Sequence, residues 1–105
     1  MTTSTHTIHA MRDKFNPNAA AGLDLVFGFR ITDEDQDFAL VVKDGTCGLQ
    51  EGKNPDANVT LVLDSATFRA IVDGETDGMQ AFMGGKMRVE GDMSLATRLP
   101  QLFPA

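Results

Sequence analysis

The residues from Leu23 to Thr32 alternate between apolar and mixed side chains, and this alternation constrains the fold more than any other feature of the chain. Side chains at alternate positions of an extended strand point to opposite faces of a sheet. Leu23, Leu25, Phe27, Phe29 and Ile31 would therefore share one strongly apolar face. Such a face needs a covering layer, so the pattern predicts a sheet covered on one side by other elements.

Shorter patterns of the same kind predict four more strands. Asp44-Gly45 is a strong signal for a tight hairpin between two of them. A fourth strand follows a polar loop, and the fifth carries Met87 and Val89 on one face. The predicted strands after the first cover residues 38–43, 46–50, 57–63 and 86–91.

Capping residues and glycines predict short helices around these strands. The first carries Ile8, Met11 and Phe15 at helical spacing, and Pro100 is expected to kink or stop the last. Asn18 to Gly22 is expected to form one more helical turn. The predicted starts are Thr5 or Thr7, Asp64 or Ser65, Thr76 or Asp77, and Asp92. Strands mixed with helices in this order predict an α+β fold, with one domain over residues 1–105 and a flexible arm over residues 1–6.

Charge and composition exclude several classes of function. The net charge is −6, which disfavours nucleic acid as a partner because a basic face is the usual footprint of such proteins. No run approaches the roughly 20 apolar residues that a membrane span needs. The chain begins without the features of a secretory signal, and its single cysteine, Cys47, cannot form an internal disulfide. We therefore expect a cytoplasmic protein with no stable membrane insertion.

No pattern in the chain indicates catalysis. His6 and His9 lie near the N-terminus, and a metal site would need further ligands. Cys47 is expected to be a small buried apolar residue. Gly84-Gly85-Lys86 fails as a phosphate loop, because glycine would be needed where Gln80 stands and Ser or Thr where Met87 stands. We predict no catalytic residue, no metal and no cofactor.

The methionines leave two interpretations open. Four of the six, Met79, Met83, Met87 and Met93, fall within residues 79–103. Patterning alone favours an ordinary packed core. Methionine is also flexible and polarisable, which suits surfaces that accommodate varied apolar partners. Periodicity cannot separate the two interpretations.

An ordered set of segments resembles the sterol carrier protein 2 family of lipid-binding domains. The resemblance is densest in "MQAFMGGKMRVEGDMSLATRL", where an aromatic residue precedes Gly-Lys, an alternating strand, Gly-Asp-Met and a helix. "LVFGFRI" resembles the first strand of the family, "FALVVKDGTCGL" the second and third, and "ANVTLVLDSATFRAIVDGE" the fourth strand and the helix after it. Order and spacing agree over roughly positions 20 to 103.

The resemblance implies a five-stranded, largely antiparallel mixed sheet with helices on one face and an apolar tunnel between the two layers. Its members bind fatty acid, fatty acyl-CoA or sterol-like lipids without catalysis, alone or attached to enzymes. An interaction or substrate-recruiting subunit for a lipid-metabolising enzyme, with the interior serving as core, is the alternative. Carried onto this chain, the lining residues would be Phe27, Phe29, Ile31, Phe38, Leu61, Phe68, Ile71, Val72, Met79, Phe82, Met83, Met87, Val89, Met93, Ala96, Leu99, Leu102 and Phe103.

The opposite face of the predicted sheet suggests a second kind of contact. Val26, Val41 and Val62 would lie there among small and charged residues. Scattered valines are common on open sheets, yet they could support a modest homodimer.

Overall fold

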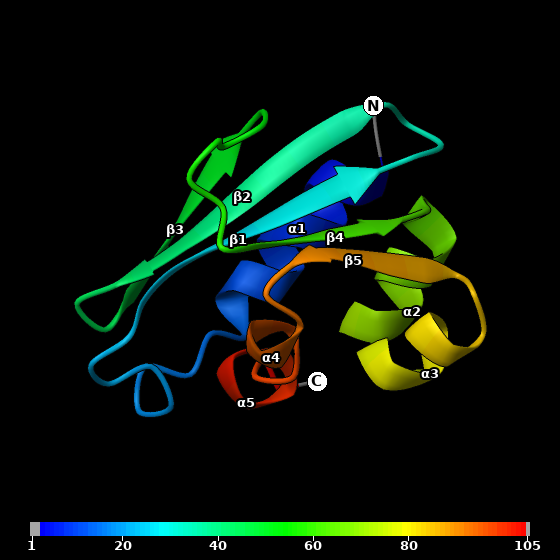
Figure 1. The fold of residues 1–105 in the computed structure, drawn as a ribbon. Helices are drawn as coiled ribbons and strands as arrows, with labels where there is room; N and C mark the ends of the chain where they lie inside the picture. Colours follow the sequence, from blue (N-terminus) through cyan, green and yellow to red (C-terminus); the bar gives the residue numbers. More distant parts are fainter. Residues whose placement is uncertain (1–2, 105) are drawn as a thin grey trace.

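Five strands form one mixed sheet in the computed structural model, which describes residues 3–104 (Figure 1). Their order across the sheet is β3-β2-β1-β4-β5. β1 and β4 run parallel, and every other neighbouring pair is antiparallel. The α+β fold expected from the alternating pattern is confirmed. The strands are β1 (Asp24–Ile31), β2 (Gln36–Lys43), β3 (Thr46–Glu51), β4 (Val59–Leu63) and β5 (Met87–Gly91).

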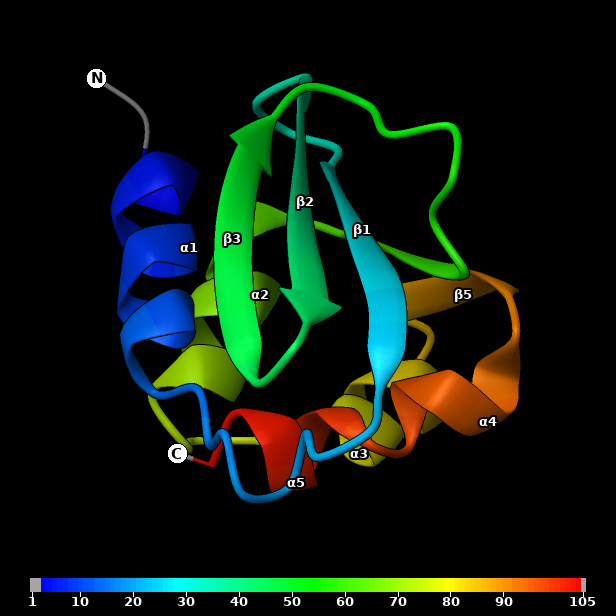
Figure 2. The same cartoon turned by 90° about the vertical axis from the view of Figure 1, so that its left-hand side faces the viewer.

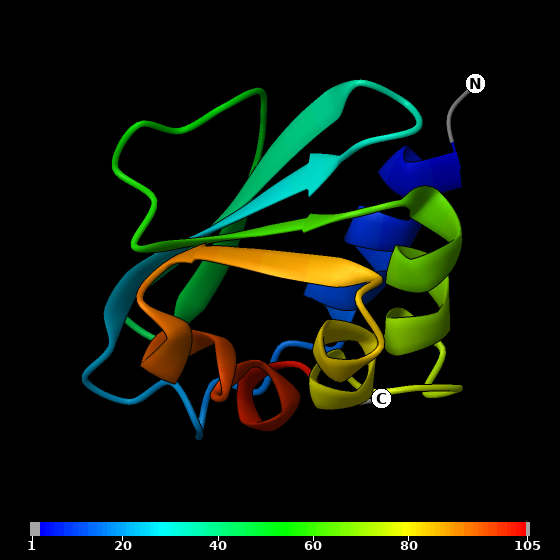
Figure 3. The same ribbon diagram turned by 45° about the vertical axis from the view of Figure 1, so that its right-hand side comes forward.

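The helices cover one face of this sheet, as Figures 1 and 3 show. α1 packs against α2 and β3, whereas α3 and α4 lie at the two ends of β5. The side chain of Lys14 donates a hydrogen bond to the carbonyl of Val72, which ties the end of α1 to the end of α2. The helices are α1 (Thr3–Asp13), α2 (Ser65–Val72), α3 (Gly78–Met83), α4 (Met93–Ala96) and α5 (Leu99–Leu102).

The inner face of the sheet follows from the register. Phe27 stands opposite Leu40 and Phe29 opposite Phe38 in the pairing of β1 with β2. Phe29 also stands beside Leu61 of β4. Because side chains alternate along each strand, these apolar residues all point to the helices. The central strands therefore present an apolar inner face to the helical layer. Most of the apolar side chains on this face are buried.

The connection from β3 to β4 crosses the outer face of the sheet (Figures 1 and 2). Gly28 of β1 is closely covered on this face: a Cβ atom there would lie 2.8 Å from the hydroxyl of Thr60, its neighbour on β4, and 3.4 Å from the Cβ of Ala57 in the connection. Ala39, on the same face, is fully buried. The outer face is thus partly covered, and less apolar surface is left open than the strand pattern suggested.

The ends of several elements differ from the sequence prediction. α1 begins at Thr3 and Ser4 is fully buried, so residues 3–6 are helical where a flexible arm was expected. Met1 and Thr2 lie outside the described residues. Residues 17–22 form a turn instead of a helical turn. Pro100 ends no helix: it lies in the first turn of α5, where its missing N–H needs no partner.

The predicted caps are confirmed for three helices. Asp64, Asp77 and Asp92 are the N-cap residues of α2, α3 and α4. Their carboxylates accept backbone hydrogen bonds at 2.7, 2.8 and 3.0 Å respectively. Each cap supplies an acceptor to an otherwise unpaired N–H at the start of its helix.

Candidate functional site

Aromatic rings fill much of the space between the sheet and helices α2 and α5. The rings of Phe29 and Phe68 stack with centroids 5.5 Å apart. Phe103, which follows α5, meets Phe27 edge-on at 6.5 Å and Phe15 at 5.7 Å. These rings bridge the two layers directly. The part of the interior beside α2 and α5 is therefore packed by its own side chains.

The expected lining residues divide into three groups by burial. Ten lie in the buried core, four are half-buried against it, and four are exposed. The buried group is Phe27, Phe29, Ile31, Phe38, Leu61, Phe68, Val72, Met87, Leu102 and Phe103. The half-buried group is Ile71, Val89, Ala96 and Leu99. The exposed group is Met79, Phe82, Met83 and Met93.

The exposed group is a correction to the sequence analysis, which placed these side chains on the inside. Met79 is 58% exposed, Phe82 38%, Met83 78% and Met93 46%. The usual rule that the apolar stripe of a helix faces the core fails for α3. Ala81, only 3% exposed, takes the inward position instead. α3 has only six residues and is followed closely by β5, which begins at Met87.

Three of the half-buried residues lie on β5 and on the helices that follow it, whereas Ile71 lies on α2. Val89 lies on the inner side of β5, Ala96 belongs to α4, and Leu99 begins α5. Leu95 of α4 is also half-buried against the core. The region beneath β5 (Figure 3) therefore combines incomplete burial with exposed methionines at both ends of the strand. We call this region, made by Val89, Leu95, Ala96 and Leu99, the β5 region.

Several buried residues lie outside the set that was predicted to line the tunnel. Ile8 and Met11 of α1 are buried in the same core, although the resemblance began only near position 20. Their helical spacing was the available signal. Val59 and Leu63 of β4 are buried, as their alternation with Leu61 indicates. Ala81 carried no signal, since its inward position depends on how α3 meets the sheet.

Polar contacts around the interior are few and structural. Asp33, in the turn after β1, accepts hydrogen bonds from the backbone N–H of Ser65 at 2.9 Å and from its hydroxyl at 2.6 Å. These bonds lower the pKa of the Asp33 carboxyl. Burial raises the pKa of the Cys47 thiol to about 11, and nearby Arg12 opposes this shift. A thiol with so high a pKa stays protonated at neutral pH and is a poor nucleophile.

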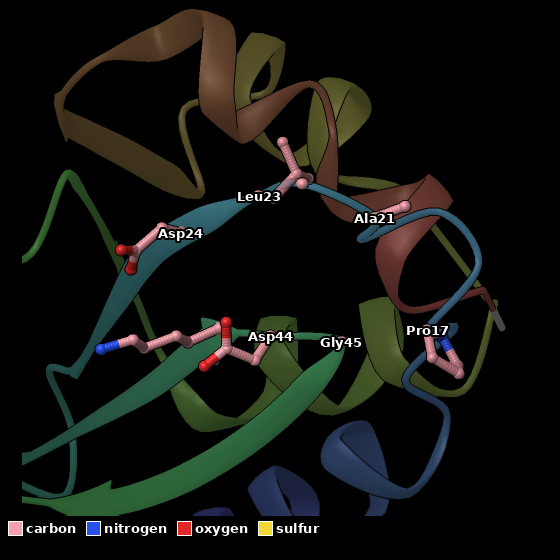
Figure 4. A pocket seen from close by; sticks show the side chains of 8 residues that line it. Pro17, Ala21, Leu23, Asp24, Asp44 and Gly45 are labelled. Carbon is pink, nitrogen blue, oxygen red and sulfur yellow. The ribbon is translucent and has the colours of Figure 1, made fainter.

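A hollow of about 400 Å³ lies elsewhere, between the turn after α1 and the β2–β3 hairpin (Figure 4). Asp24, Lys43 and Asp44 give it a polar lining. The rest of its lining is Pro17, Ala21, Gly22, Leu23 and Gly45, and Figure 4 labels four of these five positions. None of the expected lining residues borders it, so this hollow is separate from the β5 region.

The fold and its interior define a class: small α+β domains in which short helices and a five-stranded sheet enclose an apolar interior. The chain belongs to the SCP-2 sterol transfer family, whose profile matches residues 6–104. The resemblance to the sterol carrier protein 2 family, which the sequence indicated, is thereby confirmed. None of the described helices has the length and apolar character needed to cross a membrane.

The relatives are longer than this chain to different extents. Hydroxysteroid dehydrogenase-like protein 2 of Xenopus tropicalis is 29% identical over 99 residues, which are 92% of this chain and 24% of that protein. The oleate-induced peroxisomal protein POX18 of Candida maltosa is 31% identical over 71 residues, 67% of this chain and 56% of that protein. The chain thus spans only part of the length of these relatives.

Solved structures share the fold over nearly the whole chain. The sec-alkylsulfatase Pisa1 of Pseudomonas sp. contains a similar domain with a TM-score of 0.81 and 25% identity, covering 90% of this chain and 15% of that one. Palmitated SCP2L2 of Aedes aegypti matches with a TM-score of 0.76 and 20% identity, covering 94% and 92% of the two chains.

Proposed function

We propose that this domain binds an apolar lipid in the β5 region and carries it without chemical change. The observation that supports the proposal most is the pairing of an incompletely buried interior with exposed methionines at its edge, in a chain of the SCP-2 family. Two relatives with this fold, SCP2L2 and SCP-2 of Aedes aegypti, are described with bound palmitate. The ligand class proposed here includes such a fatty acid and extends to an acyl-CoA or a sterol-like lipid.

Apolar burial supplies enough free energy for such binding. A 16-carbon chain gains roughly 12 kcal/mol when buried, at about 0.8 kcal/mol per methylene. Immobilisation costs several kcal/mol, so affinity in the micromolar range or better needs no specific polar contact. Selectivity would then follow the length and width of the space that the side chains leave.

The ligand must displace some side chains to enter. Because the aromatic rings close the regions beside α2 and α5, we place the acyl chain between β5 and helices α3 and α4. Val89, Ala96 and Leu99 would contact it along its length. Met79, Phe82, Met83 and Met93 would rotate toward it as adaptable lining, which the flexibility of methionine allows.

The proposal is tested by lipid content and by displacement. Protein purified without detergent is extracted or analysed by native mass spectrometry, and a fluorescent fatty acid is then titrated and competed with palmitate. We expect bound lipid and competition. Ala96→Phe should weaken binding about tenfold by filling the β5 region, whereas Ala66→Phe on the exposed side of α2 is the matched control. Absence of bound lipid together with absence of displacement would contradict the proposal.

A recruiting role beside an enzyme is the second candidate. It is favoured by relatives in which this domain forms 24% of hydroxysteroid dehydrogenase-like protein 2 and 15% of a linear primary-alkylsulfatase. In this role the domain would hold the apolar substrate near a catalytic partner. Stimulation of such a partner by the wild-type chain, lost in Ala96→Phe and kept in Ala66→Phe, would support it.

A further inference from the structure

Helix α3 exposes its large apolar side chains and buries its smallest one. Met79, Phe82 and Met83 are spaced i, i+3 and i+4, so they share one side of the helix. That side is the exposed one, while Ala81 on the opposite side is buried. We call the exposed side, made by Met79, Phe82 and Met83, the α3 face. Soluble domains usually keep such side chains inside, and an exposed cluster marks an interaction site.

The size of the α3 face argues against a stable protein partner. A standard protein–protein interface covers about 800 Å² on each partner, with some twenty residues a side. Three partly exposed side chains on one six-residue helix supply far less. A lipid surface needs no complementary shape and accepts side chains singly. Flexible methionines and a phenylalanine suit insertion among fluid acyl chains.

Charge around the α3 face narrows the kind of lipid surface. Glu75 and Asp77 precede the helix and Lys86 follows it, so the segments that flank α3 in the sequence carry no basic cluster. The carboxylate of Asp77 already accepts the N–H of Gln80 at 2.8 Å. With a net charge of −6, the domain gains nothing from an anionic surface. A zwitterionic surface imposes no such repulsion.

We propose that the α3 face docks reversibly onto zwitterionic lipid surfaces, with Met79, Phe82 and Met83 entering the interfacial layer. The position of α3 supports this, because the helix leads into β5 and covers one end of the β5 region. Docking would bring the edge of that region against lipid. The inference goes beyond the proposed ligand site and does not depend on it, since docking is measured without any ligand in the interior.

Flotation with phosphatidylcholine vesicles tests the proposal. We expect wild-type protein to float with the vesicles and Met83→Glu to partition about tenfold less. Gln50→Glu adds the same charge on β3, far from the α3 face, and should change partitioning less than about twofold. Raising salt from about 0.1 M to 1 M should not weaken binding, because charge does not drive it. Unchanged flotation of Met83→Glu, or salt-sensitive binding, would overturn the proposal.

A fluorescent reporter gives a second, independent readout. The chain has no Trp and no Tyr, so a single introduced tryptophan reports without background. The emission of Met83→Trp, or of Met79→Trp if the first variant is unstable, should shift to the blue on adding phosphatidylcholine vesicles, while that of Gln50→Trp should not. Equal shifts at both sites, or none up to about 1 mM lipid, would overturn docking. So would a blue-shifted Met83→Trp without lipid in a dimer, because a second copy would then cover the α3 face.

Discussion

Burial separates the aromatic residues of this chain into packing residues and candidate ligand contacts. Phe29 and Phe68 are buried and stacked on each other, whereas Phe82 is 38% exposed. All three were expected to line one tunnel. Phe29 belongs to an alternating strand, and Phe68 and Phe82 belong to apolar stripes of short helices, so periodicity predicted an inward position for all three. Side-chain environment therefore decides which phenylalanine holds the fold and which is free to meet a ligand.

Replacing Phe82 tests this distinction directly. Full deletion of a buried phenylalanine costs roughly 3–5 kcal/mol. For Phe82→Ala we expect about 1–2 kcal/mol, because part of the ring already contacts water. Urea unfolding measures the change, with Phe68→Ala as the buried comparison. Affinity for a fluorescent fatty acid should fall in Phe82→Ala. Equal losses of stability in the two variants would place Phe82 in the core.

The Asp33 carboxylate links the turn after β1 to the start of α2 and makes stability depend on pH. Its pKa is lowered from 3.8 because the hydroxyl and the backbone N–H of Ser65 both donate hydrogen bonds to the charged carboxylate. The stabilisation is therefore complete above about pH 3.8 and is lost as pH falls through the lower folded pKa. The thermal midpoint of Asp33→Asn should lie below that of wild type at neutral pH, with the gap closing in acid. Asp56→Asn is the control, and a gap that persists in acid would contradict this origin.

At the scale of elements, part of the helical layer is built from short helices joined by tight turns. α3, α4 and α5 span six, four and four residues. Helices this short are not stable alone and depend on caps and on tertiary contacts. Asp77 and Asp92 supply the caps, and β5 supplies much of the packing. The part of the helical layer made by α3, α4 and α5 is therefore suited to local rearrangement around a bound ligand.

Gly91, the last residue of β5, lies close to the backbone at the start of β4. Its φ is +95°, and a Cβ atom there would lie 2.6 Å from the carbonyl oxygen of Asn58 and 3.1 Å from the Cα of Val59. Both backbone conformation and contact exclude a side chain. Gly91→Ala should lower the free energy of unfolding by more than about 2 kcal/mol. Gly48→Ala, where a Cβ meets nothing within 4 Å, should change it by less than about 0.5 kcal/mol. Urea titrations compare them, and equal effects would contradict the clash.

At the scale of the whole molecule, the two faces of the sheet are covered by different elements. The inner face is covered by five helices among the described residues, and the outer face is crossed by the β3–β4 connection. Val62 on the outer face is only 8% exposed, while Val26 and Val41 are half-buried. The apolar surface left for a homodimer is smaller than the strand pattern implied.

The homodimer through the outer face stays a prediction with a direct test. If it forms, Val26→Lys should convert a concentration-independent dimer to a monomer, because a buried unpaired charge is costly at an interface. Light scattering after size exclusion measures the mass. Lys53→Glu, in the β3–β4 connection, is the control for a change in charge. A wild-type monomer would remove the prediction.

By itself, the amino-acid sequence determined the strands, the hairpin at Asp44-Gly45 and the caps at Asp64, Asp77 and Asp92. These are local features, because alternation and capping act between residues close in the chain. Family membership was also readable, since it depends on the order of many such features. The stretch rich in methionine was readable as a helix, a strand and a helix, but not by its orientation.

Only the tertiary structure decided which apolar side chains face inward. Met87 is buried in β5, while Met79, Met83 and Met93 on either side of it are exposed. The same residue type thus takes both positions, and on α3 it is Ala81 that is buried. Burial of a side chain depends on packing between segments that include ones far apart in sequence, and periodicity carries no record of that packing.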